Sequence, residues 1–155
     1  MISDPRELSF ERVPGQPGAG AEAALVLRFP STVGYADPAV DLIARECYPE
    51  GDPGRQVLFR LRVALAEAVA NAIQCGNGAD PAKFVQVQVE LFSDRIRLAV
   101  TDEGPGFDPT AVPDPRDPGL LESPCGRGLF IIRHLAEQVE FNEKGNTIWM
   151  TLPRW

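Results

Sequence analysis

The most constraining feature of the chain is a run of small and branched apolar residues, V-A-L-A-E-A-V-A-N-A-I, from Val63 to Ile73. Only Glu67 and Asn71 interrupt the run, and because they are four positions apart, a helix places both on one face. A helix that is apolar nearly all round belongs in a core, where a carboxylate needs a cation, a metal or hydrogen-bond donors. The two polar groups are either satisfied by neighbouring groups of the protein or directed at a ligand. The run alone favours neither interpretation.

The helix that carries this pair is predicted from about Gln56 to Cys75, where Gly76 or Gly78 can end it in a left-handed cap. Its apolar residues form one continuous stripe, made of Leu58, Leu61, Leu65, Val69 and Ala72. Glu67 lies about 200° around the axis from Leu65. The polar pair is therefore expected on the other side, near the C-terminal end of the helix, where a cleft can open.

The length and net charge of the chain limit the classes of protein to which it can belong. A chain of 155 residues is one globular domain, and its net charge of −7 argues against general binding of nucleic acid or anionic membranes. The three cysteines, Cys47, Cys75 and Cys125, lack C-x-x-C spacing and accompany a single histidine, which disfavours a disulfide framework or a zinc site. Neither a secretion signal nor a membrane span is evident, so we expect a cytoplasmic protein.

The remaining elements indicate an α+β fold. Strands are predicted at 8–13 and 23–29, a helix at 37–48, a hairpin at 84–92 and 95–100, a helix at 129–139, and a closing hairpin at 140–142 and 146–152. We expect a two-layer sandwich in which about three helices cover one face of a mainly antiparallel, mixed sheet. Residues 1–21 are expected to form a flexible arm with a candidate edge strand, and residues 22–155 the domain itself.

Two glycine-rich segments are candidates for ligand contacts. In V-T-D-E-G-P-G-F-D-P, Asp102 ends a strand, and Gly104 and Gly106 either make an ordinary turn or let a ligand approach the backbone. In C-G-R-G-L-F-I-I, Gly126 and Gly128 lead into a helix, whose N-terminus with Arg127 suits a phosphate, although a simple cap has the same pattern. The proline-rich loop at 103–125 between them is long enough to be functional.

Together these segments resemble a known family. E-A-V-A-N-A (67–72), D-E-G-P-G-F (102–107) and G-R-G-L-F (126–130) match, in order and approximate spacing, the N, G1 and G2 boxes of GHKL ATPases. Within that superfamily the short domain is similar to bacterial anti-sigma regulatory factors, which are serine/threonine protein kinases of the partner-switching type. The resemblance covers about residues 22–152. No G-x-x-x-x-G-K-[ST] is present, which excludes a P-loop enzyme as far as a sequence can.

The resemblance implies a role for each motif. Asn71 would ligate the Mg²⁺ that bridges the ATP phosphates, and Glu67 would orient or deprotonate the attacking hydroxyl. Loop 103–125 would be the ATP lid. Adenine would be held by Asp102, Gly104, Gly106 and Thr147, and the phosphates by Gly126, Arg127, Gly128 and Leu129. Cys75 departs from the family, which commonly has histidine there, and His134 lies in a helix where a surface or packing role is expected.

The implied function is phosphorylation of a serine or threonine on an anti-anti-sigma antagonist, with sequestration of a sigma factor by the free protein. Dimerisation is common in such proteins, and no direct contact with nucleic acid or membrane is expected. Two alternatives remain at this point: a docking module that binds ATP without phosphotransfer, and an ATPase whose acceptor is water.

Overall fold

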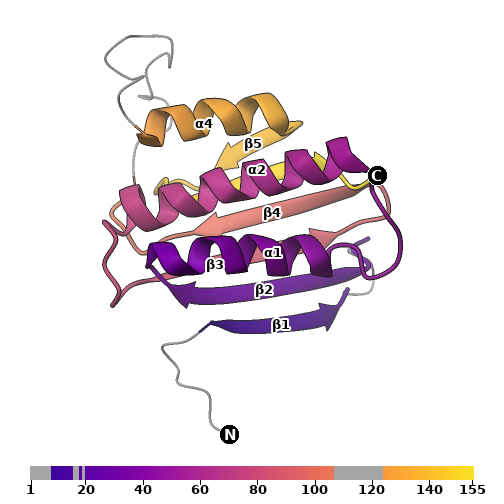
Figure 1. Ribbon diagram of the computed structural model, residues 1–155, viewed down its shortest axis with the longest axis horizontal. Helices are drawn as coiled ribbons and strands as arrows, with labels where there is room; N and C mark the ends of the chain where they lie inside the picture. The colour runs from indigo at the N-terminus through magenta and orange to yellow at the C-terminus, as the bar shows by residue number, and fades with distance from the viewer. Residues whose placement is uncertain (1–7, 16–17, 19, 107–123) are drawn as a thin grey trace, which may run out of the picture.

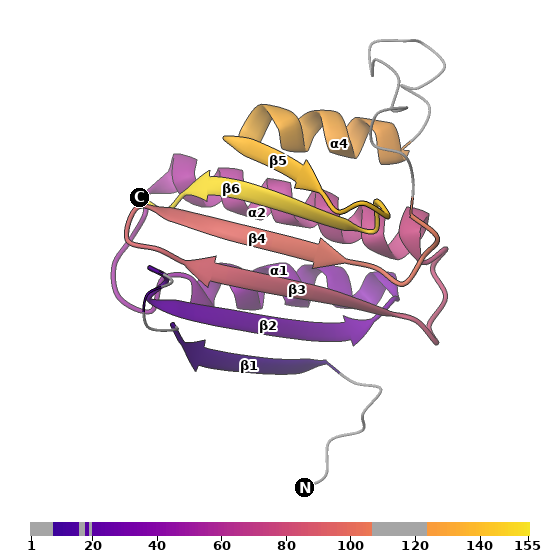
Figure 2. The ribbon, with the colours of Figure 1, turned by 180° about the vertical axis from the view of Figure 1, so that it is seen from behind.

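Six antiparallel strands form one sheet, and three helices lie on one of its faces (Figures 1 and 2). This is a computed structural model, which describes residues 8–15, 18, 20–106 and 124–155, and all structural statements concern those ranges. The strands, in the spatial order β1-β2-β3-β4-β6-β5, are β1 (Ser9–Pro14), β2 (Ala23–Pro30), β3 (Phe84–Leu91), β4 (Arg95–Thr101), β6 (Thr147–Pro153) and β5 (Gln138–Phe141). The helices are α1 (Ala36–Glu46), α2 (Arg55–Asn71) and α4 (Pro124–Leu135). The α+β, two-layer prediction is confirmed.

Alternation along the strands separates the two faces of the sheet. In β3, Val85, Val87 and Val89 are fully buried beneath the helices, and the polar residues between them point to the other face. On that face Arg97 stacks over the ring of Trp149 at 4.2 Å and pairs with Glu90 at 3.5 Å. No described helix covers this side, which explains its polar character (Figure 2).

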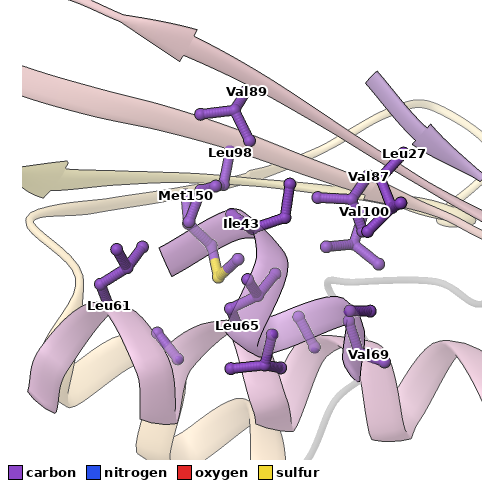
Figure 3. Close-up of a cluster of buried hydrophobic side chains, with 14 of the residues drawn as sticks. Leu27, Ile43, Leu61, Leu65, Val69, Val87, Val89, Leu98, Val100 and Met150 are labelled. Atoms are coloured by element: carbon purple, nitrogen blue, oxygen red, sulfur yellow. The ribbon is translucent and has the colours of Figure 1, made fainter. Parts of the chain in front are cut away.

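The core lies between the helices and the sheet, and α2 provides its central stripe. Leu61, Leu65 and Val69 project from α2 toward Val87 of β3 and Met150 of β6 (Figure 3). All five are 1% exposed or less, and burying each such side chain contributes about 1.5–3 kcal/mol before entropy is counted. The predicted apolar stripe of this helix is confirmed.

Contacts at both ends show that α2 and α4 run antiparallel. Near the start of α2, Arg60 donates from Nε (3.0 Å) and Nη2 (2.7 Å) to the carbonyl oxygen of Leu135, the last residue of α4. This carbonyl has no partner within its own helix, and a cation suits a helix C-terminus. At the other end, Gly128 in the first turns of α4 lies against Asn71, the last residue of α2. These contacts fix how the two helices lie side by side.

Several predicted boundaries are wrong. The described strands are all antiparallel, so the sheet is not mixed. The predicted helix 129–139 begins at Pro124, which suits a first helical turn, and it ends at Leu135. Residues 138–141 instead form β5, because Val139 and Phe141 alternate with exposed neighbours and Val139 pairs with Met150. The predicted helix 37–48 ends at Glu46.

Helix α2 is also interrupted before its predicted end. It gives way after Asn71 to a π-helical turn, η2 (Ala72–Gly76). A wider turn of this kind changes the direction in which the following residues project.

Edge strand β1 and strand β2 are where the sequence predicted them. No described helix is long and apolar enough to span a bilayer. Most of the predicted lid, residues 107–123, lies outside the described residues.

Candidate functional site

The polar pair of α2 faces the first turns of α4. A Cβ atom added to Gly128 would lie 2.9 Å from both side-chain polar atoms of Asn71 and 3.0 Å from Oε2 of Glu67. Both side chains are partly exposed, so neither is sealed in the core. Because Gly128 has no side chain, the first turns of α4 pack directly against a carboxylate and an amide.

The second part of the site is the turn after β4, where Asp102 lies against η2. A Cβ atom at Gly76 would lie 2.2 Å from Oδ2 of Asp102, and one at Gly104 would lie 2.0 Å from the carbonyl oxygen of Gly76. The sequence predicts for Gly104 either an ordinary turn or a ligand close to the backbone. In the structure Gly104 admits this chain's own backbone, because the turn and η2 pack together too closely for side chains at these positions.

Burial raises the pKa of the Asp102 carboxyl above its usual range. The hydrogen bond of 2.8 Å from the Gly104 N–H to Oδ1 and the positive charges of Lys144 and Lys83 oppose this effect without cancelling it. Desolvation therefore dominates at this carboxyl. A half-buried acceptor of this kind gains from a ligand that donates hydrogen bonds to it.

Two asparagines that the sequence reasoning missed hold this turn in place. Asn77, only 3% exposed, accepts from the Glu103 N–H at 2.7 Å and donates to the carbonyl oxygen of Phe84 at 2.9 Å. Asn146 donates from Nδ2 to the carbonyl oxygen of Asp102 at 2.9 Å, and its own carbonyl accepts from the Asp102 N–H at 3.0 Å. Asp102 is thus fixed from both sides. Asn77 lies in C-G-N-G, whose glycines suggested only a helix end, so no local signal marked it.

The turn between β5 and β6 completes this region. Thr147 pairs with Thr101, the residue before Asp102, and the two hydroxyl oxygens are 2.9 Å apart. Gly106 has φ of 77° and lies so close to the carbonyl oxygen of Lys144 that a Cβ atom would be 1.9 Å from it. Gly106 and Thr147 therefore lie on adjoining segments, beside Asp102.

The glycine segment of α4 differs from its prediction. Gly126 and Gly128 do not precede the helix; they lie within it, since α4 begins at Pro124. Only the first few N–H groups of a helix lack intrahelical partners. In α4 these N–H groups belong to the residues up to Gly126 and Arg127, which are therefore the backbone donors available to a phosphate. Arg127 is exposed, whereas the Leu129 side chain is 6% exposed and packs in the interior. Gly128 contributes a close contact with Asn71 and Glu67 rather than a donor.

The cysteines and the histidine lie in different environments. Cys47 is a fully buried free thiol, and its carbonyl oxygen accepts from Nη2 of Arg154 at 3.3 Å. Cys75, near the end of η2, is disulfide-bonded, although the sequence disfavours a disulfide framework. The side chain of Cys125 lies outside the described residues. His134 is exposed, and its ring lies tilted against that of Phe130 with centroids 4.2 Å apart, as a surface role predicts.

Within the described ranges, no three His, Cys, Asp or Glu side chains form a cluster that could hold a metal ion. Mg²⁺ takes oxygen ligands and commonly keeps only one or two from the protein, with phosphate oxygens supplying others. Glu67 and Asn71 could therefore hold such an ion only together with phosphate oxygens.

Comparison with known proteins shows which proteins this chain is similar to. The model of the histidine kinase-like ATPase domain matches residues 29–152. A serine-protein kinase RsbW of Bacillus licheniformis is 32% identical over 98 residues, 59% of this chain and 61% of that protein. An anti-sigma F factor of Bacillus cytotoxicus is 31% identical over 107 residues, 64% of this chain and 72% of that protein. The match to RsbW of Bacillus subtilis is 30% over 104 residues, again covering 61% of the relative, so this chain spans about six-tenths of the kinases' length.

Proposed function

The chain belongs to the histidine kinase-like ATPase family, and we propose that it is an ATP- and Mg²⁺-dependent serine/threonine protein kinase of the anti-sigma type. Its substrate would be a serine or threonine on an anti-anti-sigma antagonist, and its free form would bind a sigma factor in the cytoplasm. The observation that carries this proposal is the contact at Gly128, where the first turns of α4 meet a carboxylate and an amide rather than apolar groups.

The proposed chemistry assigns one task to each part of the site. The side-chain oxygen of Asn71 would hold Mg²⁺, which when bound offsets the negative charge of the phosphates. Glu67 would take the proton of the acceptor hydroxyl while the oxygen of that hydroxyl bonds to the γ-phosphorus of ATP. The bond from that phosphorus to the bridging oxygen breaks, and ADP leaves. The nearby Gly126 N–H and the Arg127 guanidinium would bind phosphate oxygens.

The base pocket would be built on Asp102. Its carboxylate would accept from the exocyclic amine of adenine, with Gly104, Gly106 and Thr147 beside it. Desolvation of the carboxyl supports this role, because a donor from the ligand offsets the cost of burying the charged form. We propose residues 22–155 as the nucleotide-binding unit, with residues 103–125 as its lid up to the start of α4.

A transfer assay tests the proposal. The protein is incubated with γ-labelled ATP, Mg²⁺ and the antagonist protein encoded beside its gene, and label is followed on each species. Label on the antagonist supports the kinase. Free phosphate alone would overturn it in favour of an ATPase, and tight ATP binding with neither product would favour a docking module.

Two variants test the assignments within the site. Glu67→Gln should keep ATP affinity and lose transfer by about 10²–10⁴-fold, the usual contribution of a general base. Asn71→Ala should weaken binding of Mg²⁺–ATP itself. Glu50→Gln, which removes an exposed carboxylate outside the site, is the matched control. Transfer by Glu67→Gln at the wild-type rate would show that the catalytic assignment is wrong.

A further inference from the structure

Positive charge is concentrated on the two helices that border the candidate site. Helices α2 and α4 contain five of the chain's 15 basic residues and one of its 22 acidic residues, although the chain as a whole has a net charge of −7. The single acid is Glu67. The sequence shows no basic cluster, because these arginines are spread over 79 positions and only the antiparallel packing of α2 on α4 gathers them.

Not all of these arginines have acidic partners. Arg62 pairs with Asp41 of α1, and Arg60 is held by the carbonyl oxygen of Leu135. Among the described residues, no carboxylate lies within ion-pair distance of the other three, Arg55, Arg127 and Arg133. All three are exposed. The two helices therefore keep positive charge that no carboxylate in the described ranges neutralises.

The outer side of the same helices also exposes large apolar groups. Phe59 is 61% exposed and, with Arg55, Gln56 and Arg60, lines a hollow at the start of α2. Val63 lies one turn further along the same side of α2 and is partly exposed, and Phe130 of α4 is 38% exposed. No described element lies outside the helix layer at this place (Figure 1). A helix that is apolar nearly all round thus buries one side against the sheet and leaves the other uncovered.

We propose that this α2–α4 surface docks the phosphoacceptor protein through an acidic segment with an apolar anchor residue. We define the surface as Arg55, Phe59, Val63, Arg127, Phe130 and Arg133. Charge complementarity selects the partner, because unpaired arginines beside exposed aromatic rings favour a segment that carries carboxylates and one large apolar side chain. The inference rests on the proposed kinase function and adds to it the place and chemistry of substrate docking.

The position of the surface fits substrate presentation. Phe59 and Glu67 are eight residues apart on α2, which is about 12 Å along the axis. An extended segment covers that distance in about four residues. A segment anchored at Phe59 and running along α2 would therefore bring a hydroxyl about four residues away toward Glu67. Arg127 and Gly128 lie at that same end of the helix pair.

Steady-state kinetics with the antagonist protein of the transfer assay test the proposal. Phe59→Ala and Arg55→Glu should each raise KM for the antagonist about tenfold, with KM for ATP unchanged and kcat at saturating antagonist within twofold. Raising ionic strength should raise the wild-type KM for the antagonist, and this dependence should be weaker in Arg55→Glu. Matched controls are Val33→Ala, at a residue 62% exposed, and Arg45→Glu on α1.

Each other outcome is decisive. Unchanged KM for the antagonist, or an equal rise in the control variants, would overturn the docking assignment. If Phe59→Ala instead converts a wild-type dimer to monomers in sedimentation without changing KM, the surface is a contact between copies and the proposal is wrong. If the wild type transfers no phosphate, the kinase proposal fails separately. Docking is then still decided by calorimetric binding of the antagonist to the wild type, Phe59→Ala and Val33→Ala.

Discussion

The Glu103 N–H donates a hydrogen bond of 2.7 Å to Oδ1 of Asn77, and this bond joins the turn after β4 to the segment that follows α2. The other end of the same amide donates to Phe84 at the start of β3. Asn77 thus connects three segments around Asp102 although it lies in none of the recognised motifs. Its burial means that water cannot replace either bond.

Asn77→Ala should therefore weaken both the fold and the base pocket. It leaves the Glu103 N–H and the Phe84 carbonyl without partners, and each such group costs about 1–3 kcal/mol when buried. We expect the free energy of unfolding in urea to fall by about 2 kcal/mol or more, and ATP affinity to fall with it. Gln88→Ala, at an exposed amide on the outer face of β3, should change neither. Equal stability of Asn77→Ala and wild type would contradict the role of this side chain.

Gly128→Ala should separate stability from function. Alanine favours a helix over glycine by about 1 kcal/mol, so α4 itself should not be weakened. The new Cβ atom would nevertheless displace the polar ends of Asn71 and Glu67, which move at little cost. We expect a thermal midpoint at or above that of the wild type together with at least tenfold weaker Mg²⁺–ATP binding. Gly34→Ala, where a Cβ atom meets nothing within 4 Å, should bind normally. Unchanged binding by Gly128→Ala would show that the positions of Asn71 and Glu67 at this contact do not matter for the nucleotide.

The Asp102 carboxyl should make stability depend on pH. Its pKa is raised in the folded state, so folding favours the protonated form, and the stability gained at low pH is lost as pH rises through the folded pKa. In the nucleotide-free protein, the free energy of unfolding relative to Asp102→Asn should therefore decrease from about pH 3.8 upward and level off above the folded pKa. Urea titrations of both proteins across this range measure it. A difference that is independent of pH would refute the desolvation of this carboxyl.

Cys47 should report global unfolding. Burial raises the pKa of its thiol to about 12, despite the opposing charges of Arg154 and Arg12, so the reactive thiolate is scarce in the folded protein. Alkylation of the Cys47 peptide by iodoacetamide at pH 8, followed by mass spectrometry, should be slow and should increase with urea in parallel with the loss of helical signal. The urea-unfolded protein provides the reference rate. Rapid alkylation before unfolding would mean that this end of the molecule opens locally.

The predictions from the sequence are correct where the pattern depends only on residues close together along the chain. Glu67 and Asn71 share a face because four residues make about one helical turn, whatever surrounds them. Alternation predicted the hairpin of β3 and β4, because period two belongs to the strand itself. The family resemblance, which the model match over residues 29–152 confirms, rests on three such local motifs. The error at 129–139 arose where a short apolar run fits both periods, and the partner strand β6 decided in favour of β5.

By itself, then, the sequence determined the order of the elements, the α+β class, the family and the placement of Glu67 and Asn71 on one helix face. Only the tertiary structure placed Asn77 and Asn146 around Asp102, brought Gly76 against its carboxylate, and gathered the arginines of α2 and α4 onto one side. The physical reason is the range of the interactions. Periodicity and capping act between residues within one or two turns, whereas these contacts join residues 26 to 75 positions apart, and they exist only once the sheet has aligned the elements.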